Sequence, residues 1–287
     1  MTNLEARTLG PYRLERKLGE GGAATVYRAY QPSMERHVAI KVLKLELAAQ
    51  DPAFLERFTR EARTVAQLQH PHILPVIDFG QTDDLAYIVM VLLEGGTLRH
   101  FLREHGPLPL DTCAFIVAQI ASALDRAHSR GISHRDLKPE NTPHYLAPEA
   151  ARGHPADERS DTYALGVMLY EMAVGQLPFQ GDTPFNLIYQ HITTPPPPPR
   201  TLKPDLPATV ERVLLKALAK DPAARYQTPL ELAEAFVDAL PQTPVASPQA
   251  EEKAGARPIG TLAVADSLLD ALPGVLPTPT PGRVVPQ

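Results

Sequence analysis

The stretch Leu-Gly-Glu-Gly-Gly-Ala-Ala-Thr-Val-Tyr, residues 18–27, places three glycines between two β-rich runs. Glycine has no side chain beyond a hydrogen atom, so backbone N–H groups in such a turn can approach an anion closely. A hairpin of this kind can lie over the phosphates of a nucleotide. A glycine hairpin is more often a plain turn, so this stretch indicates phosphate binding only together with the residues that follow it.

The next run, residues 37–44, alternates as a β-strand does. The alternation puts Ala39 and Lys41 on one face, and Val38, Ile40 and Val42 on the other. A small residue beside a lysine would admit a flat ligand and let the ammonium group reach its phosphates. A surface lysine with its stem along the sheet is the alternative, and for a single lysine that alternative would be favoured.

A helix is expected over residues 51–68, where Asp51 can cap the first turn and Pro52 fits the first helical position. Glu61 falls on its apolar stripe. A carboxylate there is costly unless it is paired, so a cation must come from the sheet, and Lys41 is the natural candidate. Such a pair would hold the lysine toward a nucleotide. The hydrophobic members of the stripe are Phe54, Phe58, Val65 and Leu68.

The stretch His-Arg-Asp-Leu-Lys-Pro-Glu-Asn, residues 134–141, contains an acid, a lysine and an asparagine. Only Thr142 separates it from Pro-His-Tyr-Leu-Ala-Pro-Glu, residues 143–149. Together with the glycine-rich turn, Val-Ala-Ile-Lys and the helical glutamate, this ordered series resembles bacterial Hanks-type (eukaryotic-like) serine/threonine protein kinases. The resemblance covers residues 12–240. Lys138, two residues after Asp136, and the Pro-His-Tyr-Leu-Ala-Pro-Glu run favour this branch over tyrosine kinases and small-molecule phosphotransferases.

The resemblance implies an α+β, two-lobed fold with a small β-rich N-lobe containing one helix and a larger, mainly α C-lobe. We expect an N-terminal arm over residues 1–11, the N-lobe over 12–92, the C-lobe over 93–240 and a flexible Pro-rich tail over 241–287. The run 195–199 is all proline and is expected to be an extended spacer. The hydrophobic patterns predict strands over 12–18, 25–30, 37–43, 73–79 and 86–91, and C-lobe helices over 98–103, 110–129, 160–174, 184–192, 208–218 and 229–240.

Specific nucleotide contacts are implied by the same resemblance. Lys41 would contact the α- and β-phosphates of ATP and be held by Glu61. Met90 would be the gatekeeper, and Val91 and Leu92 would offer backbone hydrogen bonds to adenine. Ala24 replaces the third glycine of the phosphate-binding turn. The other residues placed around the nucleotide are Gly19, Gly21, Gly22, Val26 and Ala39.

For the catalytic loop, the resemblance implies that Asp136 accepts the proton of the substrate hydroxyl, Lys138 neutralises the γ-phosphate and Asn141 binds a magnesium ion. Two further roles are structural. Asp161 would hold the loop through backbone N–H groups, and Glu149 would pair with Arg225. Protein substrates with Ser or Thr hydroxyls, ATP and Mg²⁺ follow as expected partners and cofactors.

Family members continue after the asparagine with a strand, an Asp-Phe-Gly and an activation segment, whereas here Thr142 follows Asn141 directly. Asp78-Phe79-Gly80 lies ahead of the hinge and is a chance echo. Magnesium prefers carboxylate ligands, and removing one preorganised electrostatic group costs about 10²–10³ in rate. Either the natural chain carries a stretch that this sequence lacks and is an active kinase, or the deletion is genuine and the chain is a pseudokinase scaffold or nucleotide sensor.

The composition of the chain bears on three other classes, which are nucleic-acid-binding, disulfide-bonded and membrane proteins. The chain has 287 residues, a net charge of −5 and 44% hydrophobic residues, and no dense basic block, which argues against nucleic-acid binding. The single cysteine, Cys113, excludes an internal disulfide and is expected to be buried. We see no signal peptide and no membrane segment, and expect a cytoplasmic protein. Many relatives continue past such a linker into a membrane helix, so an anchored full-length protein and a homodimer are both left open.

Overall fold

The computed structural model describes residues 4–21, 24–43, 52–82, 85–134, 137 and 143–241, and of residues 52–54, 57 and 61 it describes the backbone alone. The chain divides into two units, Met1–Leu240 and Pro241–Gln287. All helices and strands described below belong to the first unit. The expected tail over 241–287 lies outside the described residues apart from Pro241.

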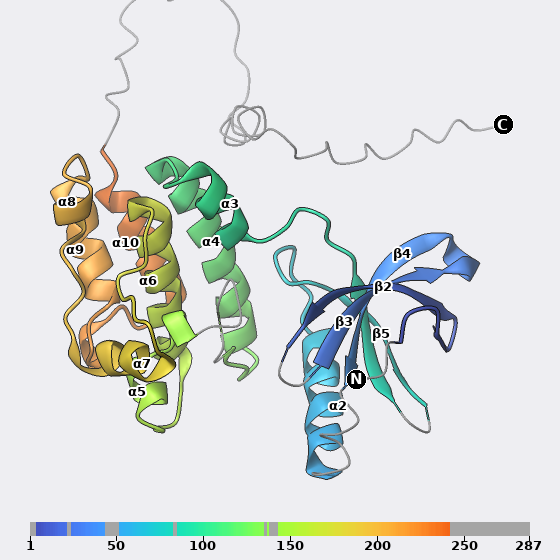
Figure 1. The fold of residues 1–287 in the computed structure, drawn as a ribbon. Coiled ribbons are helices and arrows are strands. Elements are labelled where there is room, and N and C mark those ends of the chain that lie inside the picture. The colour runs from blue at the N-terminus through green and yellow to red at the C-terminus, as the bar shows by residue number, and fades with distance from the viewer. Residues whose placement is uncertain are drawn as a thin grey trace, which may run out of the picture. The chain divides into compact units, whose positions relative to one another are not determined.

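One antiparallel sheet forms the N-terminal part of the fold (Figure 1). Its strands are β1 (Thr8–Leu9), β2 (Tyr12–Glu20), β3 (Ala24–Gln31), β4 (Arg36–Leu43), β5 (Val76–Gln81) and β6 (Ala86–Val91), in the order β1-β2-β3-β4-β6-β5. The sequence pattern missed β1, because a two-residue strand is too short to show alternation. Leu9 nevertheless pairs with Tyr12 and is fully buried, so the sheet begins inside the segment expected to be an arm.

Each face of the sheet carries its own hydrophobic cluster. Val38, Ile40 and Val42 are at most 2% exposed and pack with residues of β2, β3 and β6. On the opposite face, α2 (Pro52–Ala66) contributes Phe58 and Ala62, which cluster with residues of β4 and β6. The alternation predicted for residues 37–44 is therefore confirmed for residues 38–42, and Lys44 lies outside the described residues.

Two predicted boundaries in this part differ from the structure. The strand predicted over 73–79 begins instead at Val76, and the preceding segment makes a turn in which the N–H of Ile73 donates to the carbonyl of His70. Pro71 and Pro75 have no N–H to contribute to a ladder, which explains the late start. The helix predicted over 51–68 ends at Ala66, although Leu68 is buried as expected.

The C-terminal part is helical (Figure 1). The six predicted helices are present, with small shifts at their ends: α3 (Leu98–His105), α4 (Leu110–His128), α6 (Glu158–Val174), α7 (Pro184–Thr193), α9 (Ala208–Ala217) and α10 (Pro229–Ala239). Short helical segments not predicted from the pattern are η1 (Pro32–Met34) in the sheet region, and η2 (Pro143–Tyr145), α5 (Pro148–Ala151), α8 (Pro199–Leu202) and η3 (Pro222–Ala224) here. The expected α+β division is thus present.

Side chains at the helix starts explain several of these boundaries. The hydroxyl groups of Thr97, Thr183 and Thr228 accept hydrogen bonds from the backbone N–H of the third residue of α3, α7 and α10. Such caps satisfy an N–H that has no partner within the helix. α7 and α10 also have proline in their first turn, where its missing N–H costs nothing.

Helix α6 lies at the centre of the C-terminal core. Every residue from 160 to 174 is buried, as its nearly uniform apolar sequence predicts. It packs against α4, α9 and α10. A side chain on Gly166 would come within 2.8 Å of the Cβ atom of Ala217, so only glycine allows this approach of α9. Cys113 is fully buried in the same cluster.

The proline run is part of the fold. Residues 194–198 are not helical, but Pro199 begins α8 and is buried, so the spacer is one residue shorter than expected. The hydroxyl group of Tyr170 in α6 donates to the carbonyl of Pro197 at 3.1 Å. Among the described residues, no helix is both long enough and apolar enough to cross a membrane.

Candidate active site

The glycine-rich turn joins β2 to β3. Its last ladder pair is Glu20 with Thr25, and the N–H of Gly21 donates to the carbonyl of Ala24 at 2.9 Å. A methyl group placed on Gly19 would meet no atom of the structure within 4 Å. Glycine is therefore not required there by the packing of the chain, and the open space suits the close approach of a ligand to the backbone. Gly22 lies outside the described residues.

Lys41 stands on the face of the sheet that α2 covers. It pairs across the sheet with Val26 of β3 and with Ile88 of β6. Directly opposed residues share a face, so these three side chains lie on one side, together with the pair Ala39 and Met90. The predicted nucleotide residues of β3, β4 and β6 are thus brought together on one face, away from the core formed by Val38, Ile40 and Val42.

Helix α2 positions a ring beside this lysine. The Lys41 Nζ atom lies 5.8 Å from the centroid of Phe58, which is 5% exposed. Glu61 is three residues further along the same helix, and residues at this spacing are neighbours on a helix surface. The Glu61 side chain itself lies outside the described residues, so the Lys41–Glu61 pair stays a prediction.

The hinge follows the last strand of the sheet. Val91 pairs with Val38 at the end of the β4–β6 ladder, and its side chain is 38% exposed. Leu92 comes directly after this pair. The adenine contacts expected from the backbone of these two residues, and the gatekeeper role of Met90, remain predictions.

Asp161 anchors the start of the predicted catalytic loop. Its Oδ2 atom accepts a hydrogen bond from the backbone N–H of His134 at 2.8 Å, and lies 2.8 Å from Nε2 of His128. Asp161 is 1% exposed, so these bonds compensate a carboxylate removed from water. The expectation that Asp161 holds the loop through backbone N–H groups is confirmed for His134, whereas the contribution of His128 was missed.

The acid–base residues of the loop lie outside the described residues. This applies to Asp136, Lys138 and Asn141, and to Thr142 at the join. Leu137, between the first two, is described and packs against the large C-terminal cluster. The chemical roles of the three polar residues therefore stay predictions.

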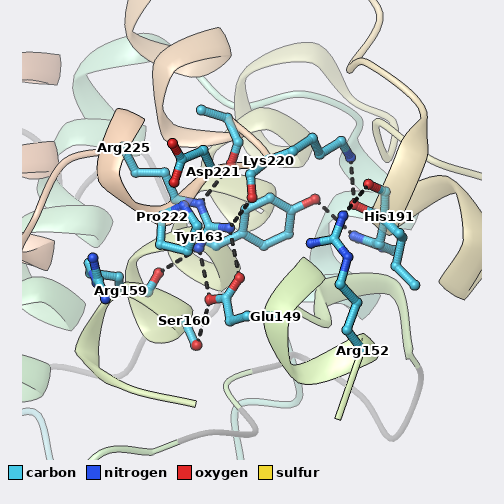
Figure 2. Close-up of polar contacts among 12 residues, drawn as sticks. Glu149, Arg152, Arg159, Ser160, Tyr163, His191, Lys220, Asp221, Pro222 and Arg225 are labelled. Carbon is cyan, nitrogen blue, oxygen red and sulfur yellow. Dashed lines mark hydrogen bonds and ion pairs between the residues drawn. The ribbon is translucent and has the colours of Figure 1, made fainter. Parts of the chain in front are cut away.

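Glu149 and Arg225 form a buried ion pair, as expected (Figure 2). The guanidinium group donates to both carboxylate oxygens, at 2.9 and 2.8 Å, and Ser160 donates to the same carboxylate at 2.6 Å. Burial alone would raise the pKa of Glu149, but the hydrogen bonds from Arg225 and Ser160 outweigh it and hold the pKa below its ordinary value. The pair fixes α5 against the segment that follows α9.

A second buried contact was missed by the sequence analysis. The Tyr145 hydroxyl of η2 donates to Glu171 of α6 at 2.5 Å, and both residues are buried. No local pattern links two residues 26 positions apart. Together with the Glu149–Arg225 pair, this bond fastens the residues just after the join to the central part of the core.

The Asp78-Phe79-Gly80 sequence has a structural role. It lies in β5, where Asp78 accepts a hydrogen bond from the Tyr12 hydroxyl at 3.0 Å. A side chain on Gly80 would collide with the ring of Tyr87, at 2.1 Å. These contacts belong to the packing of the sheet, so the interpretation of this triplet as a chance echo is confirmed.

Comparison with known proteins gives consistent matches. Residues 12–141 and 142–237 match a family model described as the protein kinase domain. The serine/threonine-protein kinase PrkC of Bacillus subtilis is 37% identical over 255 residues, which cover 77% of this chain and 39% of PrkC. The serine/threonine-protein kinase PknB of Mycobacterium leprae is 39% identical over 259 residues, covering 77% of this chain and 42% of PknB. The chain spans about two fifths of the length of these relatives.

Solved structures agree with these relatives. The crystal structure of the Mycobacterium tuberculosis PknI kinase domain is 31% identical, has a TM-score of 0.69, and covers 83% of this chain and 100% of that chain. The family match breaks between Asn141 and Thr142. The PrkC alignment runs over 255 positions, whereas 77% of 287 residues is about 221, so about 34 aligned positions face no residue of this chain.

Proposed function

The chain belongs to the protein kinase family, and we propose that it is a serine/threonine protein kinase domain that binds ATP and transfers the γ-phosphoryl group to Ser or Thr hydroxyls of protein substrates. The observation that carries the proposal is the shared face of Val26, Ala39 and Lys41, above which α2 places Phe58. The relatives named above support the serine/threonine branch, because both are described as serine/threonine kinases.

The residues of the sheet suit a nucleotide. Ala39 is small and leaves room for a flat base, while Lys41 supplies a positive charge on the same face. Gly19 leaves open space at the phosphate-binding turn. When bound, ATP supplies the phosphoryl group, and the family uses the strand lysine to orient its phosphates. Glu61 would restrict the lysine to that orientation.

The catalytic loop would then act on the acceptor. Asp136 would take up the proton of the substrate hydroxyl, and Lys138 would lower the cost of the negative charge on the transferred group. His134, which begins this loop, is fixed to the buried carboxylate of Asp161. A loop tied at this point would keep Asp136 in place relative to the core of the domain.

Magnesium fits the chain less well than ATP does. The sequence offers the amide oxygen of Asn141, but no Asp-Phe-Gly follows it. Magnesium is held mainly by carboxylates and phosphates, so the expected ligand set lacks its charged protein member. The residues of this chain therefore fit the nucleotide better than they fit the metal.

This missing carboxylate favours a second candidate function, a pseudokinase that binds nucleotide and partner proteins with little or no phosphotransfer. Losing one preorganised electrostatic group costs about 10²–10³ in rate. Here the carboxylate and the activation segment are absent together, so we expect the chain with this sequence to transfer phosphate far more slowly than its full-length relatives.

Two measurements separate the candidates. Nucleotide binding is followed by thermal unfolding with ATP, and 100 times the dissociation constant stabilises the folded state by about 2.7 kcal/mol, or about 5–11 °C. Lys41→Met should abolish this shift, while Lys216→Met, a lysine of α9, should leave it unchanged. A chain that ATP does not stabilise would contradict both candidates.

Transfer is then measured with radiolabelled ATP and a generic acceptor protein. Transfer that Asp136→Asn abolishes supports the kinase, whereas ATP binding without transfer supports the pseudokinase. A chimera sharpens the result, with the Asp-Phe-Gly and activation segment of PrkC inserted between Asn141 and Thr142. Recovery of transfer in the chimera would show that the rest of the site is competent, and its continued absence would count against the assigned catalytic residues.

A further inference from the structure

Helix α7 ends in an unusual chemical setting. The last four carbonyl groups of an α-helix have no partner within the helix, and backbone N–H groups of the next residues commonly supply one. After Thr194, which caps α7, residues 195–199 are all proline. Proline has no N–H group, so the following backbone cannot cap this helix beyond Thr194.

Two cationic side chains from elsewhere in the fold occupy this end instead (Figure 2). Lys220 donates from Nζ to the carbonyl of His191 at 2.8 Å and to that of Gln190 at 3.1 Å. Arg152 donates to the carbonyl of Ile192 at 3.1 Å. The N–H of Thr194 also donates to Gln190, at 3.0 Å. Three successive carbonyl groups thus receive side-chain donors.

The position of Lys220 is electrostatically unfavourable for an ammonium group. Burial, together with the nearby charges of Arg225 and Arg152, lowers its pKa to about 8. The ring of Phe179, whose centroid is 4.0 Å from Nζ, compensates only part of this cost. The side chain is therefore held there by its N–H donors, which a neutral amine would still provide in part.

Both cations start from elements that are already joined to each other. Arg152 is the residue that caps the end of α5, three residues after Glu149. Arg225 pairs with Glu149 and also donates to the carbonyl groups of Ala219 and Lys220, at 2.7 and 3.1 Å. The ion pair therefore joins α5 to the segment 219–225. Each of these two elements also contributes one cationic side chain to the end of α7.

We propose that Arg152 and Lys220 form a two-cation clamp that supplies the donors missing beyond Thr194 at the end of α7 and couples the position of its last turns to α5. The clamp fixes the direction of the helix face that carries Phe185 and Tyr189, which are 79% and 55% exposed. Because α5 lies a few residues after the join at Asn141, a displacement of α5 is transmitted to α7.

Hydrogen exchange followed by mass spectrometry tests the clamp without requiring any activity. In Lys220→Met, peptides covering residues 186–194 should exchange about 10- to 100-fold faster, the range for losing hydrogen bonds to a charged donor. Arg152→Ala should raise exchange in the same peptides. Lys216→Met is the matched control, because Lys216 lies 4.2 Å from the ring of Tyr226 and should leave α7 unchanged.

A rescue experiment tests the cause. Replacing Pro195 and Pro196 by glycine in the Lys220→Met background returns two backbone N–H groups to the end of α7, and should recover most of the lost protection. Exchange near α7 that is unchanged in both single variants would overturn the proposal. Equal acceleration throughout the domain would also overturn it, since the clamp predicts a local effect, and so would a rescue variant no better protected than Lys220→Met.

Discussion

Replacing Arg225 by methionine should destabilise the domain strongly. The guanidinium group is 2% exposed and makes two hydrogen bonds to Glu149. It also donates to three backbone carbonyl groups, those of Ala219 at 2.7 Å, and of Arg159 and Lys220 at 3.1 Å. Methionine fills a similar volume but supplies none of these five donors, so a buried carboxylate and three carbonyl groups lose a partner.

The expected size follows from the geometry. Removing one member of a buried ion pair typically costs about 3–5 kcal/mol, because the remaining charge stays buried without compensation. For a domain of this size that corresponds to a melting temperature lower by about 6–20 °C. Urea denaturation at pH 7 measures the free energy of unfolding directly. The double variant Glu149→Gln with Arg225→Met should be less destabilised than Arg225→Met alone, since no charge is then left unpaired.

The pH dependence gives a sharper test. In the natural chain the pKa of Glu149 lies below its ordinary value of 4.5, so its stabilisation is present above about pH 4.5 and is lost as the pH falls through the folded-state pKa. In Arg225→Met burial remains while the main compensating bonds are gone, so the folded-state pKa should rise above 4.5. The difference in the free energy of unfolding between the natural chain and Arg225→Met should then become smaller from pH 7 toward pH 5. A difference below about 1 kcal/mol, or one that is constant over this range, would refute the reasoning.

Three further predictions concern the C-terminal core. Burial lowers the pKa of His191 to about 3, so below pH 6.5 the unfolded chain takes up a proton that the folded chain does not. The free energy of unfolding should therefore fall by up to about 1.4 kcal/mol per pH unit below pH 6.5. Urea denaturation of His191→Gln should show a weaker dependence of this free energy on pH, and an equal dependence in both chains would contradict the prediction. Gly166→Ala should lower the free energy of unfolding by about 1–3 kcal/mol despite the better helix propensity of alanine, because the new Cβ would meet Ala217 at 2.8 Å. Adding Ala217→Gly to this variant should restore stability. A Gly166→Ala variant as stable as the natural chain would count against the close packing of these two helices. Burial raises the pKa of Cys113 to about 12, so an aromatic disulfide reagent should label it only after denaturation, and rapid native labelling would show the site to be open.

The elements that sequence could predict are those with a repeating physical cause. Strand β4 was predicted because buried and exposed side chains must alternate along it, and α6 because an apolar surface on all sides requires full burial. The short elements β1, α5 and α8 are about one period long, so no pattern repeats within them. Their positions depend on contacts with distant residues, such as the pairing of Leu9 with Tyr12.

The contacts of the candidate site also fall into those that the sequence could predict and those that it could not. The shared face of Ala39 and Lys41 follows from strand geometry alone, whereas the Glu149–Arg225 pair was expected only from the family resemblance. The bond of His128 to Asp161 and the donors from Lys220 to α7 were missed. Each joins residues about 30 positions apart, and no local spacing encodes such a contact. The proline run was the one available signal for Lys220, because it shows that no backbone N–H beyond Thr194 can cap α7.

These contacts separate the folding of the domain from its chemistry. Asp161 holds His134 just before the loop, and Glu149 and Tyr145 are bonded to the core just after the join. The segment that the family carries between Asn141 and Thr142 is not needed for any of these bonds. The buried ion pair and α6 are both present in the structure of this chain without that segment. We therefore expect folding and phosphotransfer to respond to different substitutions.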